Sequence, residues 1–65
     1  KERIMISYLK KLLKQNDSVK IHLIDGTVVS ALHFKKGYSN GNCLVIDEDN
    51  VEHYLSSRYI VQIES

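Results

Sequence analysis

The sequence predicts a mainly β domain, in which one N-terminal helix precedes a five-stranded, strongly bent antiparallel sheet that forms a small open barrel. Three observations support this prediction. The spacing of apolar residues changes from a helical period to a period of two after residue 18. Five short apolar runs then follow, separated by polar turns. The 65 residues contain no proline and no linker-like stretch, so we expect a single domain over residues 1–65.

The first element is expected to be an amphipathic helix over about residues 4–15. Its apolar side chains recur three and four positions apart and therefore share one stripe: Met5, Tyr8, Leu9, Leu12 and Leu13. The polar residues 16–18 are expected to end the helix and turn the chain. Leu9 and Leu12 are expected to dock the helix on the open end of the barrel.

Five strands are expected at about residues 19–24, 27–36, 43–47, 51–55 and 59–63. Asp25-Gly26 predicts a hairpin turn between the first two, because glycine accepts a positive φ without steric cost. In the second strand Val28, Ser30, Leu32 and Phe34 share one phase. The longest loop is expected at residues 37–42, and residues 47–50 are expected to form an acidic turn.

The small size predicts self-association. A chain this short buries only roughly 60% of its unfolded surface, and Cys43 is the only cysteine, so no internal disulfide can form.

The three histidines and this thiol lack metal-ligand spacing, so we expect no metal and no cofactor. No signal peptide or membrane-length apolar stretch is evident, which favours a cytoplasmic location without membrane contact.

Charge is distributed unevenly along the chain, although the formal net charge is only +1. Residues 1–15 contain five basic side chains and one acidic one, whereas residues 44–65 contain five acidic and one basic. The pattern indicates one basic and one acidic surface, and the basic surface is compatible with nucleic-acid binding. A solvated helix face is the alternative explanation.

Several segments resemble the RNA-binding Hfq family, and the order of one helix and five strands resembles the Sm-like plan of that family. Ser7-Tyr8-Leu9 is followed by Leu12, and residues 19–26 are similar to the family's V-x-I-x-L-x-N-G strand and turn. Residues 55–63 resemble its last two strands. The resemblance covers about residues 7–64 and needs an insertion of about four residues in the loop at 37–42.

The chain departs from the family pattern at several positions. The family's Tyr-Lys-His triplet reads here as Ser56, Ser57 and Arg58, and the aromatic residue that begins its third strand is Cys43. Met5 replaces a glutamine, and Ala31 replaces a glycine that helps to bend the second strand. The fold and a ring tolerate such changes better than RNA specificity does. The alternative is therefore an Sm-like ring with weak RNA affinity that serves as a protein-interaction or assembly module.

The resemblance implies a hexameric ring in which the fourth strand of one subunit pairs with the fifth strand of the next. It also implies an RNA chaperone in post-transcriptional regulation by small RNAs, with U-rich RNA near the pore and A-rich RNA on the opposite face. We expect no enzyme, because the sequence has no nucleophile with a base, no glycine-rich phosphate cradle and no paired catalytic carboxylates.

On the pore side, the matching positions are Cys43, Ser57 and Arg58, and Tyr38 in the enlarged loop is a further stacking candidate. The Arg58 guanidinium suits a phosphate or a uracil edge, or alternatively an ion pair with Glu52 or Asp47 of a neighbouring subunit. Cys43 is alternatively a small packing residue, and Tyr38 a solvent-exposed loop residue without a role.

On the opposite face, the matching positions are His22, Gly26, Thr27, Ser30, His53 and Gln62. His22 stands where the family stacks an aromatic ring on adenine, and His53 stands where a glutamine reads the adenine edge. Both are alternatively ordinary outward-facing strand residues. Because the pore side has lost a charge and a stacking surface, A-rich RNA is expected to bind more tightly than U-rich RNA. Sequence-blind phosphate binding is expected at Lys10, Lys11 and Lys14.

Overall fold

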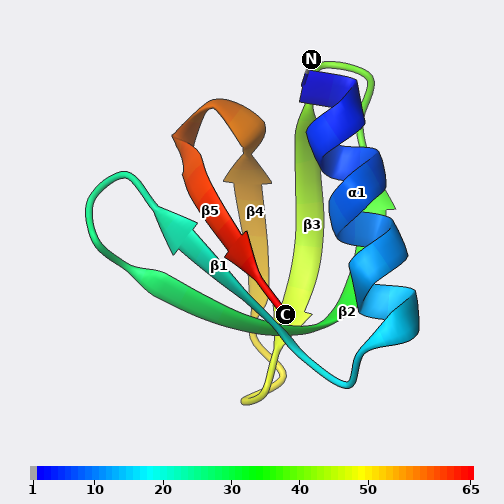
Figure 1. Ribbon diagram of the computed structural model, residues 1–65, viewed down its shortest axis with the longest axis vertical. Helices are drawn as coiled ribbons and strands as arrows, with labels where there is room; N and C mark the ends of the chain where they lie inside the picture. The colour runs from blue at the N-terminus through cyan, green and yellow to red at the C-terminus, as the bar shows by residue number, and fades with distance from the viewer. Residues whose placement is uncertain (1) are drawn as a thin grey trace.

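The computed structural model describes residues 2–65, with side chains from residue 5 onward. A helix, α1 (Glu2–Gln15), precedes five strands and a short 3-10 helix: β1 (Val19–Leu23), β2 (Val28–Gly37), β3 (Asn42–Asp47), β4 (Glu52–Ser56), η1 (Ser57–Tyr59) and β5 (Ile60–Glu64). All strand pairs are antiparallel, and the sheet order is β4-β3-β2-β1-β5 (Figure 1). The predicted fold class is therefore confirmed.

The sheet is strongly bent but does not close. β2 curves beneath the other strands in Figure 1, and its pairing with β3 shifts register between Ala31 and His33 and again between Phe34 and Lys36. Such bulges bend and twist a strand locally. β4 and β5 lie at the two ends of the sheet, joined along the chain by η1, and each keeps one unpaired edge within the described residues.

The element boundaries differ slightly from those predicted. The helix begins at Glu2 rather than at residue 4, and the strand boundaries move by one residue except at the start of β1 and the end of β3, which are as predicted. The long loop expected at 37–42 is a tight turn, because β2 extends to Gly37 and β3 begins at Asn42. The Tyr38 backbone N–H donates to the Asn42 carbonyl at 2.9 Å, which extends the strand ladder into the turn.

The helix packs through a stripe centred on Leu9. Ile6 and Leu12 are buried on either side of it, each about 60° around the helix, whereas Tyr8 lies about 100° away and is 52% exposed. Tyr8 was therefore wrongly predicted to lie on the buried stripe. The buried stripe consists instead of Ile6, Leu9 and Leu12, which are spaced three residues apart. Burial of this stripe leaves the Tyr8 hydroxyl in water.

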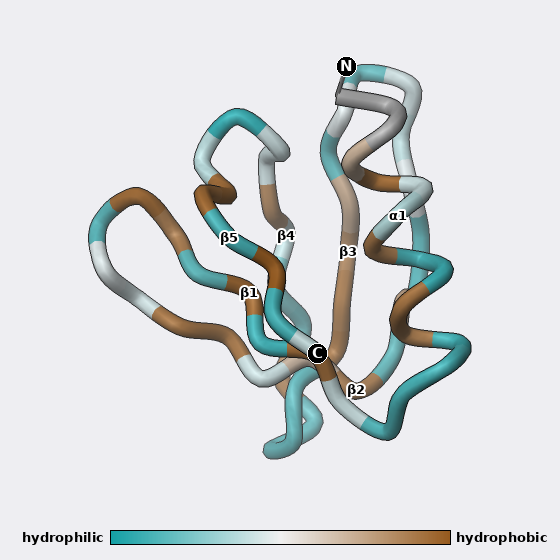
Figure 2. The backbone as a smooth tube through the Cα atoms, viewed as in Figure 1, coloured by the Kyte–Doolittle hydropathy of each residue, from teal (hydrophilic) through white to brown (hydrophobic). Residues whose placement is uncertain are grey.

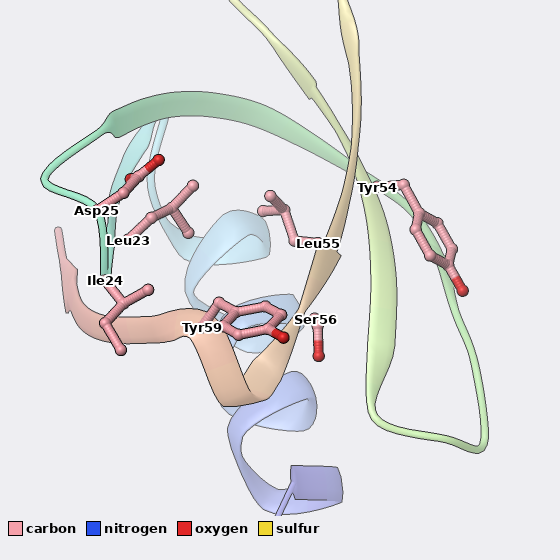
Figure 3. A pocket seen from close by; sticks show the side chains of 7 residues that line it. All are labelled: Leu23, Ile24, Asp25, Tyr54, Leu55, Ser56 and Tyr59. Atoms are coloured by element: carbon pink, nitrogen blue, oxygen red, sulfur yellow. The ribbon is translucent and has the colours of Figure 1, made fainter.

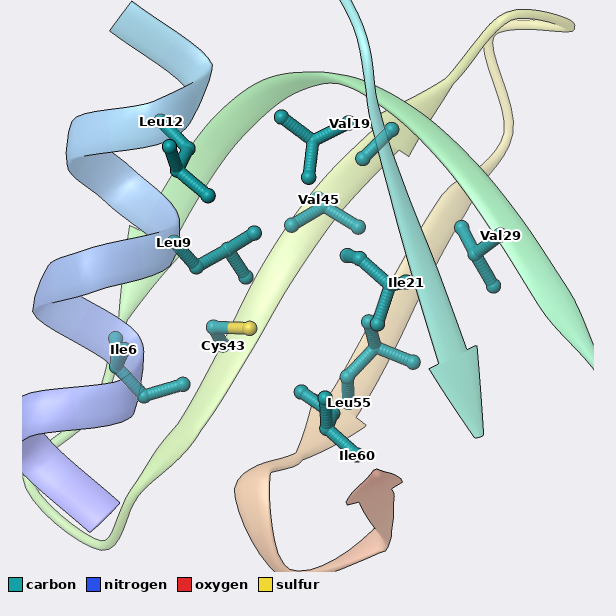
Figure 4. Close-up of a cluster of buried hydrophobic side chains, with 11 residues drawn as sticks. Ile6, Leu9, Leu12, Val19, Ile21, Val29, Cys43, Val45, Leu55 and Ile60 are labelled. Atoms are coloured by element: carbon teal, nitrogen blue, oxygen red, sulfur yellow. The ribbon is translucent and has the colours of Figure 1, made fainter. Parts of the chain in front are cut away.

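The core lies between α1 and the concave face of the sheet (Figure 4). The alternation in β1 places Val19 and Ile21 inside, as the sequence suggests. β2 has no single phase: Val29 and Ala31 are buried first, and Phe34 packs against the core only after the first register shift. The members with no exposed surface or almost none are Leu9, Ile21, Val19, Val45, Cys43 and Ala31.

The predicted hairpin turn at Asp25-Gly26 is present. Gly26 has a φ of +90°, and the Thr27 backbone N–H donates to Asp25 Oδ1 at 2.9 Å.

The β3–β4 turn is the hydrophilic segment at the bottom of Figure 2. No helix of the described residues has the length and hydrophobicity needed to cross a membrane.

Candidate nucleic-acid interface

A polar cavity of about 350 Å³ opens between the β2–β3 turn and η1. It is lined by Asn40, Asn42, Ser56, Arg58 and Tyr59. The Ser57 N–H donates to the Gly41 carbonyl at 3.1 Å and joins the two walls, and within the turn the Asn42 N–H donates to the side-chain Oδ1 of Asn40 at 3.2 Å. The cavity is thus a fixed feature between two chain segments that are distant in sequence.

Arg58 and Tyr59 give this cavity its chemistry. The Arg58 side chain is exposed and forms no ion pair with any side chain described from residue 5 onward. The two acids considered as its partners are engaged within the chain, Glu52 by Lys35 and Asp47 by His53. Tyr59, which is 53% exposed, lines the same cavity. The cavity therefore combines a free cation, an aromatic ring and amide groups.

Cys43 and Ser57 do not belong to this surface, and the structure corrects both assignments. The Cys43 side chain is fully buried in the core on β3 (Figure 4), which matches the alternative of a small packing residue. Ser57 is only 4% exposed, and its Oγ has no hydrogen-bond partner among the described atoms. Neither side chain is placed to contact RNA.

Burial raises the pKa of the Cys43 thiol to about 11, from an ordinary value of 9.0. The folded state disfavours the thiolate, so the Cys43 contribution to the free energy of unfolding is fully present below pH 9. This contribution is lost as the pH rises from 9 through 11, because the unfolded chain gives up the thiol proton first. We expect Cys43→Ala to flatten the decline of the urea midpoint over that range, as followed by circular dichroism. An equal decline in both proteins would assign the effect to other groups.

Tyr38 is not an unengaged loop residue. Its ring lies edge-on to Tyr54, with centroids 5.4 Å apart and planes at 65°, and Lys36 Nζ lies 5.0 Å from its centroid. Tyr54 was not nominated from the sequence, because its position in a strand does not show that it contacts the β2–β3 turn. Only its alternation with the buried Leu55 could have indicated that Tyr54 faces outward.

The opposite-face candidates on β1, β2 and β5 are partly brought together. His22 and Gln62 are register partners across β1 and β5, and Ser30 lies two residue pairs further along, opposite Lys20. Gly26 and Thr27 are exposed in the adjoining turn. His22 Nε2 lies 2.8 Å from Glu64 Oε1, so this imidazole already has a carboxylate neighbour.

His53 lies elsewhere in the chain. β3 and β2 separate its strand, β4, from β1 and His22. Its Nε2 lies 2.6 Å from Asp47 Oδ2, while Asp47 Oδ1 accepts the backbone N–H groups of Asp49 and Val51. The His53 hydrogen bond, followed by the Val51 N–H, holds the pKa of Asp47 below its usual value. His53 therefore helps to hold the acidic turn.

The three lysines of α1 are all exposed, but they are not equivalent. Lys10 and Lys14 border a cavity of about 210 Å³ whose other lining residues are Leu13, Leu32, His33 and Phe34. Lys10 Nζ lies 5.9 Å from the centroid of the Phe34 ring. Lys11 is not part of this lining, which fits a solvated helix position.

A more apolar cavity of about 250 Å³ lies between the β1–β2 turn and the end of β4 (Figure 3). Its lining comprises Leu23, Ile24, Asp25, Tyr54, Leu55, Ser56 and Tyr59. Ile24 is 68% exposed at its rim. The Tyr54 ring points away from it in Figure 3, toward the outer side of β3. The cavity thus joins the end of β1 and its turn to the end of β4 and η1.

Among the side chains described from residue 5 onward, no three of His, Cys, Asp or Glu are grouped so that they could hold a metal ion. Comparison of the chain with protein-family models, curated proteins and solved structures found no match. The function is therefore inferred from the geometry of the cavities and the free strand edges.

Proposed function

We propose that the chain is an Sm-like RNA-binding ring protein that acts as an RNA chaperone in regulation by small RNAs. One observation carries the proposal: Arg58 and Tyr59, both exposed, line one polar cavity of about 350 Å³. Single-stranded RNA requires positive charge for its phosphates and aromatic surfaces for its bases. Asn40 and Asn42 add amide donors and acceptors suited to a base edge.

The free strand edges support the ring. β4 and β5 each end the sheet with unpaired backbone groups, which are a liability in an isolated chain. Pairing of β4 with β5 of the next copy satisfies both edges and covers the apolar cavity next to Ile24. The resemblance implies a hexamer. In such a closed ring each copy contributes one Arg58 cavity, so the cavity is repeated around the axis. Repetition multiplies weak contacts to one RNA strand.

The same pairing also bears on A-rich RNA. β4 of one copy would bring His53 toward Gln62 and His22 of the next, although these residues are apart within one chain. The A-rich preference therefore stays a prediction.

A second candidate is a ring that binds protein and has little affinity for RNA. Glu64 beside His22 and Asp47 beside His53 place negative charge where an A-rich strand would run. Carboxylates there repel the phosphates of RNA. Burial of Cys43 and Ser57 also removes two of the RNA contacts that were expected on the pore side.

The test is a fluorescence-anisotropy titration with A-rich and U-rich oligonucleotides of equal length at about 0.15 M salt. We expect A-rich RNA to bind more tightly and His22→Ala to weaken only A-rich binding. Arg58→Ala should weaken U-rich binding about 10- to 100-fold, since a charge-assisted hydrogen bond contributes about 1.5–3 kcal/mol.

Lys20→Ala is the charge-matched control, because Lys20 is exposed on β1, away from the Arg58 cavity. It should leave U-rich binding within about twofold, well under the loss from one charge-assisted hydrogen bond. Tighter U-rich than A-rich binding would contradict the expected preference. Absence of binding to both oligonucleotides, even at low salt, would favour the protein-binding ring.

A further inference from the structure

A tyrosine pair lies on the outer face of the sheet beside the Arg58 cavity. Tyr38, from the β2–β3 turn, meets the ring of Tyr54 on β4 edge-to-face at 5.4 Å. Tyr54 is 57% exposed, and its hydroxyl accepts a hydrogen bond from Asn42 Nδ2 at 2.8 Å. The two rings are therefore fixed relative to each other while one of them stays open to solvent.

A free cation accompanies the rings. Lys36 Nζ lies 5.0 Å from the Tyr38 ring centroid, and Lys36 makes no ion pair with any side chain described from residue 5 onward. Its neighbour Lys35 differs, because it pairs with Glu52. A lysine over an aromatic face holds a position that a nucleobase can take, while its flexible stem lets the ammonium move to an adjacent phosphate.

The pair is continuous with the Arg58 cavity. Asn42 and Ser56 form one cross-strand pair of β3 and β4 and line the cavity, and Leu44 and Tyr54 form the pair two residues further along. Positions two residues apart face the same side of a sheet and are separated by roughly 7 Å. Asn42 therefore belongs to both places, since it lines the cavity and hydrogen-bonds Tyr54.

We propose that Tyr38, Tyr54 and Lys36 form a second nucleotide subsite, which extends the Arg58 cavity along one single strand of RNA. A base stacks on Tyr38 against the edge of Tyr54, and Lys36 binds the adjoining phosphate. This assignment rests on the proposed RNA-binding function. It requires a strand rather than a mononucleotide, because one nucleotide fills only one of two subsites that meet at Asn42.

The experiment compares Tyr38→Ala, Tyr38→Phe and Tyr8→Ala in the titration with the oligonucleotide that binds the unmodified protein. Tyr38→Ala is expected to weaken binding about 5- to 100-fold, the range of one base–aromatic stack. Tyr38→Phe keeps the ring and should bind like the unmodified protein. Tyr8→Ala removes an exposed tyrosine on α1 and should have no effect. Circular dichroism checks that each variant is folded.

Intrinsic fluorescence gives a second readout, because the chain has four tyrosines and no tryptophan. RNA that stacks on Tyr38 should quench tyrosine emission, and Tyr38→Phe should lose part of that quenching while keeping its affinity. Adenosine monophosphate and uridine monophosphate at concentrations equal to that of the RNA should not displace it.

Each outcome has a separate meaning. Equal affinities and equal quenching in the unmodified protein and Tyr38→Ala would overturn the subsite and leave the proposed function standing. Displacement by an equal concentration of mononucleotide would overturn the assignment to a strand. Absence of RNA binding in the unmodified protein would overturn the proposed function and this subsite with it.

Discussion

Replacement of Leu9 by alanine is expected to remove a large part of the stability of the fold. Leu9 has no exposed surface and lies at the centre of the contact between α1 and the sheet (Figure 4). Truncation of a buried leucine costs about 2–5 kcal/mol, and a 65-residue domain at about 0.05–0.15 kcal/mol per residue has only about 3–10 kcal/mol in total. Urea unfolding followed by far-UV circular dichroism measures the loss.

Tyr8→Ala is the matched control on the same helix. Its side chain is 52% exposed, so its loss should change the free energy of unfolding by about 0.5 kcal/mol or less. Leu12→Ala, at the edge of the same stripe, should lie between the two. Equal unfolding midpoints for Leu9→Ala and the unmodified chain would mean that α1 is not part of the core.

The second large effect concerns assembly. Light scattering at micromolar concentration should give the unmodified protein a mass of about 45 kDa, the mass of six 7.5-kDa chains in a closed ring. Val61→Lys should shift the mass toward that of one chain. Val61 is exposed on β5, and a charged residue on an edge strand is a common way in which proteins prevent edge-to-edge pairing.

Tyr8→Lys adds the same charge at an exposed position on α1, away from both sheet edges, and should leave the mass unchanged. A mass of 7.5 kDa for the unmodified chain at these concentrations would end the ring proposal. Unchanged assembly of Val61→Lys would show that the copies meet at a surface other than the β5 edge.

The order of elements could be predicted because local signals agreed with one another. The change of apolar period after residue 18 and the Asp25-Gly26 turn fix where the helix ends and the first hairpin forms. The buried phase of β2 could not be predicted, because it depends on two register shifts with β3. These arise where the strand passes from one neighbour to the other, and no residue type marks them.

The candidate site was predicted less well, and for a related reason. Positions carried over from the resemblance nominated Cys43 and Ser57, but whether such positions face solvent depends on how β3 and η1 sit against α1. Arg58 was nominated in the same way, and its side chain is exposed in the cavity. Tyr59 directly follows Arg58 but was not nominated, and Tyr54 could not be found because its contact with Tyr38 joins distant segments.

The bend of β2 has a consequence for any assembly built on these edges. Ala31 is the residue at which β2 passes from one neighbour to the other, with Val19 opposite it on β1 and Asp47 opposite it on β3. The register shifts that follow set the angle between the half of the sheet ending in β5 and the half ending in β4. In a closed ring that angle decides how many copies complete the circle, at about 60° per copy for six. A change in these register shifts would therefore change the number of copies that close the ring.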